Sequence, residues 1–80
     1  MTLYQFYECD QDEQEALLKK ATFLIERKDR HYRYQLLQLY SFYLEVKYSM
    51  FYKIKEDFYA FEDTELLEPY LSEMNIRQLL

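Results

Sequence analysis

The chain has 80 residues, of which 50% are apolar and 20% aromatic, and its 15 acidic and 10 basic side chains give a net charge of −5. A folded chain of this size buries only about 60% of the surface that its unfolded form exposes, so we expect one small domain over residues 1–80. The apolar content argues against a disordered chain. The single cysteine, Cys9, cannot close an internal disulfide. The fold must therefore depend on a large aromatic core, on self-association, or on both.

No segment predicts export or membrane insertion. The first apolar stretch, Leu3–Tyr7, is short, contains Gln5 and has no basic residues before it, unlike a signal peptide. Nothing approaches the roughly 18 consecutive apolar residues of a membrane span. With one free thiol, the chain is expected to be cytoplasmic and to have no membrane partner.

The beginning of the chain predicts helix. Thr2 followed by Gln5 fits a capping box, and Asp10 followed by Glu13 gives a second start signal. We expect either two short helices or one kinked helix over residues 3–20. A strand at residues 3–8 is the alternative, because tyrosine and phenylalanine favour strands.

From Ala21 the pattern predicts four strands, in the stretches ATFLIER, YRYQLLQLY, FYLEVKY and YKIKEDFYAF. Alternation is clearest in the third, which points one set of side chains to one face and a second set to the other. The first set is Phe42, Leu44, Val46 and Tyr48, and the second is Tyr43, Glu45 and Lys47. In the fourth strand the same rule groups Tyr52, Ile54, Phe58 and Ala60. Short connections predict an antiparallel meander.

The absence of glycine affects the predicted turns. Tight hairpins usually need a residue with positive φ, which glycine adopts at least cost. We therefore expect wider turns at residues 28–32, 41 and 49–51. The alternative is one long bent strand over residues 32–48, with Ser41 as an interruption.

The last segment predicts helix again. Asp63 and Thr64 are good caps, and Pro69 suggests a kink or the start of a second helical turn. The apolar stripe comprises Leu66, Leu67, Tyr70, Leu71 and Met74, after which Ile76, Leu79 and Leu80 are expected to dock. The predicted fold class is α+β: an N-terminal helical segment, a four-stranded antiparallel meander and a C-terminal helix, with the helices covering one face of the sheet.

Several stretches, TLYQF, ERKD, LYSFYLEVKY and LLEPYL, together resemble a family of short bacterial proteins of about 80 residues and no known activity. The resemblance covers nearly the whole chain. It implies a bacterial, cytoplasmic protein and assigns no functional residues. Members of that family often have a small turn residue such as glycine where this chain has Ser41.

The residues needed for catalysis and for cofactors are scarce. His31 lies among basic residues in a predicted turn, where a solvated histidine is typical, and Cys9 lies between Glu8 and Asp10, which should raise the pKa of its thiol. Asp10 and Asp12 begin like a calcium loop, but Glu15 occupies the position that requires glycine. Zinc would need more ligands, and phosphate loops need glycine. We therefore expect that the protein is not an enzyme and that it binds no metal, cofactor or small-molecule substrate.

A basic stretch over residues 19–33, together with sheet tyrosines, suggests a single-stranded nucleic-acid binder as an alternative function. The net charge of −5 argues against it, because phosphate backbones would be repelled overall. The basic stretch could equally be a helix end and a hairpin turn in water.

The tyrosines predict a contact surface. Strand parity groups Tyr34, Tyr48 and Tyr52 with the core and points Tyr43 and Tyr59 to the opposite face, beside Glu45 and Lys47. One helical layer cannot cover so many rings, and tyrosine suits a surface that is wet in one state and buried in another. The hypothesis is a non-catalytic protein-interaction module with a regulatory, antitoxin, immunity or inhibitory role. It would self-associate through the outer sheet face or an edge strand, using Tyr43, Glu45, Lys47 and Tyr59.

Overall fold

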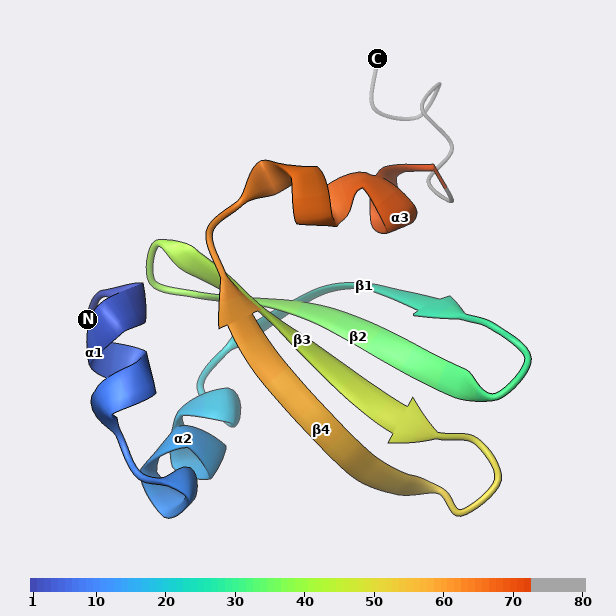
Figure 1. The fold of residues 1–80 in the computed structure, drawn as a ribbon, viewed down its shortest axis with the longest axis horizontal. Helices are drawn as coiled ribbons and strands as arrows, with labels where there is room; N and C mark the ends of the chain where they lie inside the picture. Colours follow the sequence, from blue (N-terminus) through green and yellow to red (C-terminus); the bar gives the residue numbers. More distant parts are fainter. Residues whose placement is uncertain (73–80) are drawn as a thin grey trace.

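The computed structural model describes residues 1–72, apart from the side chain of Glu56. Two short helices are followed by a four-stranded sheet and then by a 3₁₀ turn that continues into a last short helix (Figure 1). The predicted α+β class and its order of elements are confirmed. The predicted roles of Met74, Ile76, Leu79 and Leu80 lie outside the described residues.

The N-terminal segment forms two helices, α1 (Leu3–Glu8) and α2 (Gln11–Leu18). Each begins with the predicted capping box: the Thr2 hydroxyl accepts a hydrogen bond from the Gln5 amide at 3.1 Å, and the Asp10 carboxylate accepts one from the Glu13 amide at 2.8 Å. The side chains of Gln5 and Glu13 bond back to the cap amides. These local bonds explain why residues 3–8 are helical despite their aromatic content.

The sheet is an antiparallel meander of four strands in sequence order: β1 (Thr22–Lys28), β2 (Tyr32–Leu39), β3 (Phe42–Ser49) and β4 (Ile54–Phe61). Residues 32–48 therefore form a hairpin and not the single bent strand that was the alternative. Its link is only Tyr40 and Ser41, so the expectation of a wider turn there was wrong. Tyr40 adopts φ = 55°, and Lys53 adopts φ = 58° in the next turn. Non-glycine residues thus take the left-handed conformation that the turns need.

The larger core lies on the face that α1 and α2 cover, which we call the Phe6 face. The alternation predicted for β3 is confirmed here, because Phe42 and Leu44 are fully buried and Val46 nearly so. Phe6 from α1 packs against the ring of Phe42, with ring centroids 5.6 Å apart. The buried residues of this core are Phe6, Leu37, Leu39, Phe42, Leu44, Val46 and Ala60.

A second, smaller core lies on the opposite face, which we call the Tyr70 face. It is covered by the 3₁₀ turn η1 (Thr64–Leu67) and by α3 (Glu68–Leu71), with Asp63 as the expected cap and Pro69 in the first turn of α3. Its buried members are Leu36, Phe61 and Tyr70. The prediction that helices cover one face was therefore wrong. The sheet is a central layer with helical elements on both sides.

Two residues assigned to the core in the fourth strand are exposed. Tyr52 is 68% exposed because it lies in the turn before β4, and Ile54 is 55% exposed. The pairing of β3 with β4 shifts register between Lys47 and Tyr48. Because of this shift, simple alternation along the strand no longer places Ile54 on the same face as Phe58. Tyr34 was also assigned to the face of Tyr48, but it packs against the second core, on the Tyr70 face.

Candidate interaction surface

The four residues predicted to form an interface lie on the Tyr70 face. Tyr43, Glu45 and Lys47 alternate along β3, and Tyr59 of β4 is the direct partner of Glu45 in the ladder. Glu45 is buried, Tyr43 and Lys47 are half-buried, and Tyr59 is exposed. The structure therefore places the predicted residues together, but it does not present them as one open surface.

Glu45 is held inside the molecule. It is 8% exposed, and its Oε2 accepts a hydrogen bond of 2.6 Å from the hydroxyl of Tyr70 on α3. The guanidinium of Arg27, on β1, lies 3.8 Å from the same oxygen. Glu45 thus connects α3 to two strands of the sheet, and its contacts are structural ones.

Arg27 lies between aromatic rings. Its guanidinium is 4.0 Å from the ring centroid of Tyr34 and 5.1 Å from that of Tyr70, distances typical of cation–π contacts. Its buried Nε has no hydrogen-bond partner within residues 1–72. Burial, followed by hydrogen bonding to Glu45 and the charge of its carboxylate, raises the pKa of the Tyr70 hydroxyl well above its ordinary value. This cluster is a buried polar centre that fixes the C-terminal elements on the sheet.

Tyr43 and Tyr59 belong to an aromatic row with Phe61 between them. The Tyr43 ring stacks on Phe61 at 5.7 Å between centroids, and the Tyr59 ring is tilted against Phe61 at 5.5 Å. Tyr43 is half-buried, whereas Tyr59 is 40% exposed. Burial and then the carboxylate of Glu45 raise the pKa of Tyr59 to about 12. Tyr59 is thus the more accessible of the two predicted tyrosines.

Lys47 lies near the end of β3 that α3 does not cover. Its ammonium is 3.9 Å from the ring centroid of Tyr32, a residue at the start of β2. Both side chains are partly exposed. This end of the Tyr70 face leads directly to the two turns at the far end of the sheet.

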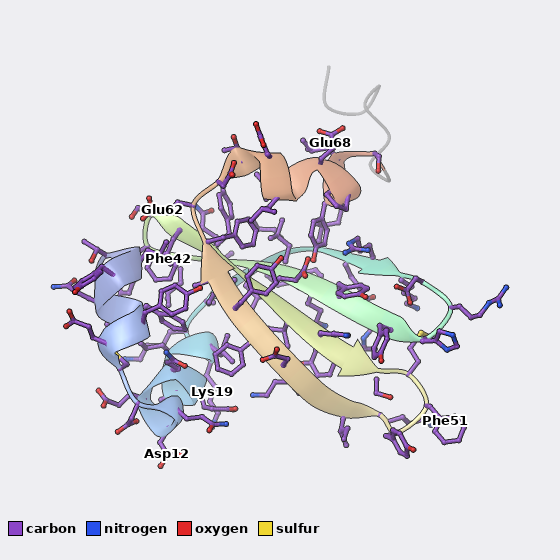
Figure 2. The ribbon with its side chains drawn as sticks, in the orientation of Figure 1. Asp12, Lys19, Phe42, Phe51, Glu62 and Glu68 are labelled. Carbon is purple, nitrogen blue, oxygen red and sulfur yellow. The ribbon has the colours of Figure 1, made fainter. Side chains whose placement is uncertain are left out.

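Four exposed apolar residues gather around the turn between β3 and β4. We call this group the aromatic tip, and it consists of Met50, Phe51, Tyr52 and Ile54. Phe51 is 85% exposed, and its ring meets that of Tyr52 edge to face with centroids 5.0 Å apart. Figure 2 shows Phe51 at the opposite end of the sheet from Phe42 and the N-terminal helices. Four large apolar side chains at one turn exceed the scattered exposure that is normal for a surface.

Backbone hydrogen bonds hold the aromatic tip in a defined shape. The amide of Lys53 donates to the carbonyl of Ser49 at 2.8 Å, and the amide of Met50 donates to the carbonyl of His31 at 3.0 Å in the neighbouring turn. In that neighbouring turn the Asp29 carboxylate accepts hydrogen bonds from the amides of His31 and Tyr32, which lower the pKa of Asp29. The two turns are therefore joined to each other.

Basic side chains surround the aromatic tip. An open cleft of about 500 Å³ lies between the two turns and is lined by Arg30, His31, Tyr32, Ser49, Met50, Phe51 and Tyr52. A second cleft of about 340 Å³ is lined by Lys28, Arg33, Tyr48, Ser49, Met50 and Lys53. Four cations thus flank the tip although the whole chain carries a net charge of −5. The acidic residues labelled in Figure 2, Asp12, Glu62 and Glu68, lie at the other end of the sheet or beside α3.

Sequence reasoning missed the aromatic tip for an identifiable reason. The stretch SMF was predicted as a turn, but Tyr52 and Ile54 were counted as buried strand residues. The exposed pair Met50 and Phe51 was the available signal, because polar residues are usual in turns.

The basic stretch of residues 19–33 does not form one patch. Lys19 and Lys20 lie just before the first residue of β1, whereas Arg30 lies in the turn after its last residue. The seven residues of β1 separate them by about 23 Å at the usual strand rise. Only the later part of the stretch belongs to the surroundings of the aromatic tip.

The candidate catalytic residues also lie apart. Cys9 lies between α1 and α2, and partial burial, followed by the charges of Glu13, Asp10 and Glu8, raises the pKa of its thiol. His31 is exposed in the turn after β1. Within residues 1–72, no group of three or more acidic, histidine or cysteine side chains could hold a metal ion. The acidic residues Asp10 and Asp12 act at the start of α2, as the helix-capping interpretation predicts.

The helices of the described region are too short or too polar for any of them to cross a membrane. Comparisons with protein-family models, with curated proteins and with solved structures found no match to the chain.

Proposed function

We propose that the chain is a small, non-catalytic protein-interaction module that acts by occupying a partner's surface with its aromatic tip. The exposure of Phe51, 85%, is the observation that carries this proposal. Leaving such a ring in water contributes nothing to folding, and aromatic residues supply much of the energy of protein interfaces. Tyr32 and Lys47 extend the proposed surface from the tip onto the open end of the Tyr70 face, and Tyr59 lies further along that face, opposite Glu45.

The partner we propose has an apolar groove with an acidic rim. Apolar side chains of the aromatic tip would fill the groove, while Lys28, Arg30, Arg33 and Lys53 would face the rim. A regulatory, inhibitory or immunity role fits a module that binds without chemistry. A cytoplasmic location is part of the proposal, since the lone thiol of Cys9 suits a reducing compartment.

The experiment compares two serine variants at exposed aromatic residues. Phe51→Ser removes the centre of the aromatic tip, and Tyr4→Ser removes a ring on α1 that is 75% exposed. A partner is captured by crosslinking in the native cells and purified, and its affinity for each variant is measured by calorimetry. We expect Phe51→Ser to weaken binding by about 30-fold or more, as for interface hot spots, and Tyr4→Ser to leave it unchanged. Equal affinities for both variants would show that the tip is not the contact surface.

The second candidate function is binding of single-stranded nucleic acid. The observation in its favour is that rings and cations are combined at the aromatic tip. Titration of the chain with a single-stranded homopolymer at low salt, followed by tyrosine fluorescence, tests this function. Quenching that disappears steeply as salt rises would favour the nucleic-acid function. We expect no quenching, because the net charge of −5 opposes the approach of phosphates.

A further inference from the structure

The two edge strands of the sheet, β1 and β4, differ in how their outward backbone groups are covered. On the β4 edge, the hydroxyl of Tyr7 from α1 donates to the carbonyl of Ala60 and accepts from the Ala60 amide at 3.1 Å. An ion pair between Glu15 of α2 and Lys55 adds a second contact between the helices and this strand. An edge strand whose outward backbone groups are already bonded offers little to another strand. The N-terminal helices therefore protect the backbone of β4 at Ala60 and cover the strand again at Lys55.

The described residues, 1–72, give the β1 edge no comparable protection. β1 pairs only with β2, and within residues 1–72 no further hydrogen bond reaches its backbone. Two of its apolar side chains are exposed, Phe23 by 54% and Leu24 by 42%. An open edge with apolar side chains is a template for another strand.

An apolar cleft lies beside this edge. It has a volume of about 320 Å³ and is lined by Leu24, Ile25, Leu36, Tyr43, Leu67, Tyr70 and Leu71. Leu71, at the end of α3, is 41% exposed. A strand added to β1 would thus gain backbone hydrogen bonds and apolar contacts with α3 at once.

The sequence of β1 favours a second copy of the same strand as the occupant. Its first three residues, 22–24, are uncharged, and its last three, 26–28, are all charged, with Ile25 between them. Antiparallel pairing of two copies about Ile25 places each charged half beside the uncharged half of the other copy. Parallel pairing would instead place like charges side by side, which is destabilising. The strand is therefore self-complementary in the antiparallel direction.

We propose that two copies of the chain associate through antiparallel pairing of their β1 edges, which joins two four-stranded sheets into one of eight strands. The arrangement has two-fold symmetry and closes on itself, so it yields a dimer and not a fibre. The aromatic tips lie outside the new contact, because they belong to the turn between β3 and β4. The dimer would present two tips to partners.

The test measures the mass of the whole chain by light scattering over a wide dilution series. We expect a dimer whose dissociation constant rises at least tenfold in Leu24→Glu, because pairing about Ile25 places position 24 opposite Glu26 of the other copy, and like charges directly opposite each other are destabilising. Leu24 lies at the irregularity in the β1–β2 pairing and is partly exposed, so the fold should accept this change. Tyr4→Glu is the matched control for added charge, and Phe51→Ser is the control for the aromatic tip. Neither should change the dissociation constant.

Hydrogen exchange provides a second measurement that does not depend on a variant. Amides of β1 should become less protected on dilution, while those of β3 should not change. A monomer at every concentration up to about 1 mM would overturn the proposal, as would a dimer weakened by Phe51→Ser but not by Leu24→Glu. A monomer whose β1 amides gain protection only when another protein is added would assign the edge to a different occupant and would equally overturn pairing with a second copy. Loss of the dimer in Leu24→Glu with intact partner binding would separate this proposal from the function of the tip.

Discussion

Phe42 and Phe51 lie at the two ends of β3, and their surroundings differ completely. Phe42 begins the strand beneath the N-terminal helices and is fully buried, whereas Phe51 follows the strand in a turn and is 85% exposed. Both are large apolar rings in a chain with a small core, so each could have contributed to stability. The difference indicates that one end of the sheet is built for folding and that the other leaves its apolar surface for contact with something else.

The largest effect is expected at the covered end of the sheet, where Phe42→Ala removes a fully buried ring. Removal of a buried phenylalanine costs about 3–5 kcal/mol, a large part of the stability of a small domain. We expect urea unfolding, followed by circular dichroism, to show a loss of this size or a chain that is already unfolded. A loss below about 1 kcal/mol would mean that Phe42 is not a main support of the fold.

The second core should show a smaller effect. Tyr70→Phe leaves the buried carboxylate of Glu45 without its hydroxyl donor, so we expect the free energy of unfolding to fall by about 1–3 kcal/mol. The control is Tyr4→Phe, because Tyr4 is exposed and its hydroxyl should not matter. Similar urea midpoints for both variants would show that the Glu45 contact does not hold α3 on the sheet.

The same contact predicts how stability depends on pH. Tyrosine in the unfolded chain loses its proton near pH 10, whereas burial and Glu45 raise the pKa of Tyr59 to about 12 and that of Tyr70 also upward. Above pH 10 the folded chain therefore binds more protons than the unfolded chain, and its stability falls as pH rises through this range. The contribution is complete below pH 10. Urea unfolding at several alkaline pH values should show a steeper fall for the wild type than for Tyr70→Phe, and equal slopes would contradict the assignment.

The smallest effect is expected at the exposed end. Phe51→Ser should change the free energy of unfolding by no more than about 0.5 kcal/mol, because the ring is already in water. Thermal unfolding of the variant beside the wild type measures this. A clear loss of stability would mean that the aromatic tip belongs to the core after all, and its proposed role in binding would lose its basis.

The features that the sequence predicted are those set by neighbouring residues. The capping boxes at Thr2 and Asp10 need only a partner three residues away, and the alternation of β3 follows from strand geometry. Each pattern is complete within one element. The number and order of the strands could therefore be read correctly.

The features that it did not predict depend on distant contacts. Glu45 was expected on a surface because charged residues are usually exposed. It is buried instead, and the tyrosine that binds it, Tyr70, lies 25 residues further along the chain. That contact is one of those that hold α3 on the Tyr70 face. The positions of Tyr52 and Ile54 depended on where the turn ended and on a register shift in the ladder. Strand parity cannot reveal either of these irregularities in advance.

The hydroxyl of Tyr7 has a consequence for how the chain reaches its fold during synthesis. Its partner, Ala60, is 53 residues further along, so α1, which is synthesised before the sheet, cannot make this contact until β4 has followed. The hairpins form from neighbouring segments and can assemble early. The nascent protein should therefore pass through a stage in which the meander is complete while the backbone of Ala60 still faces water.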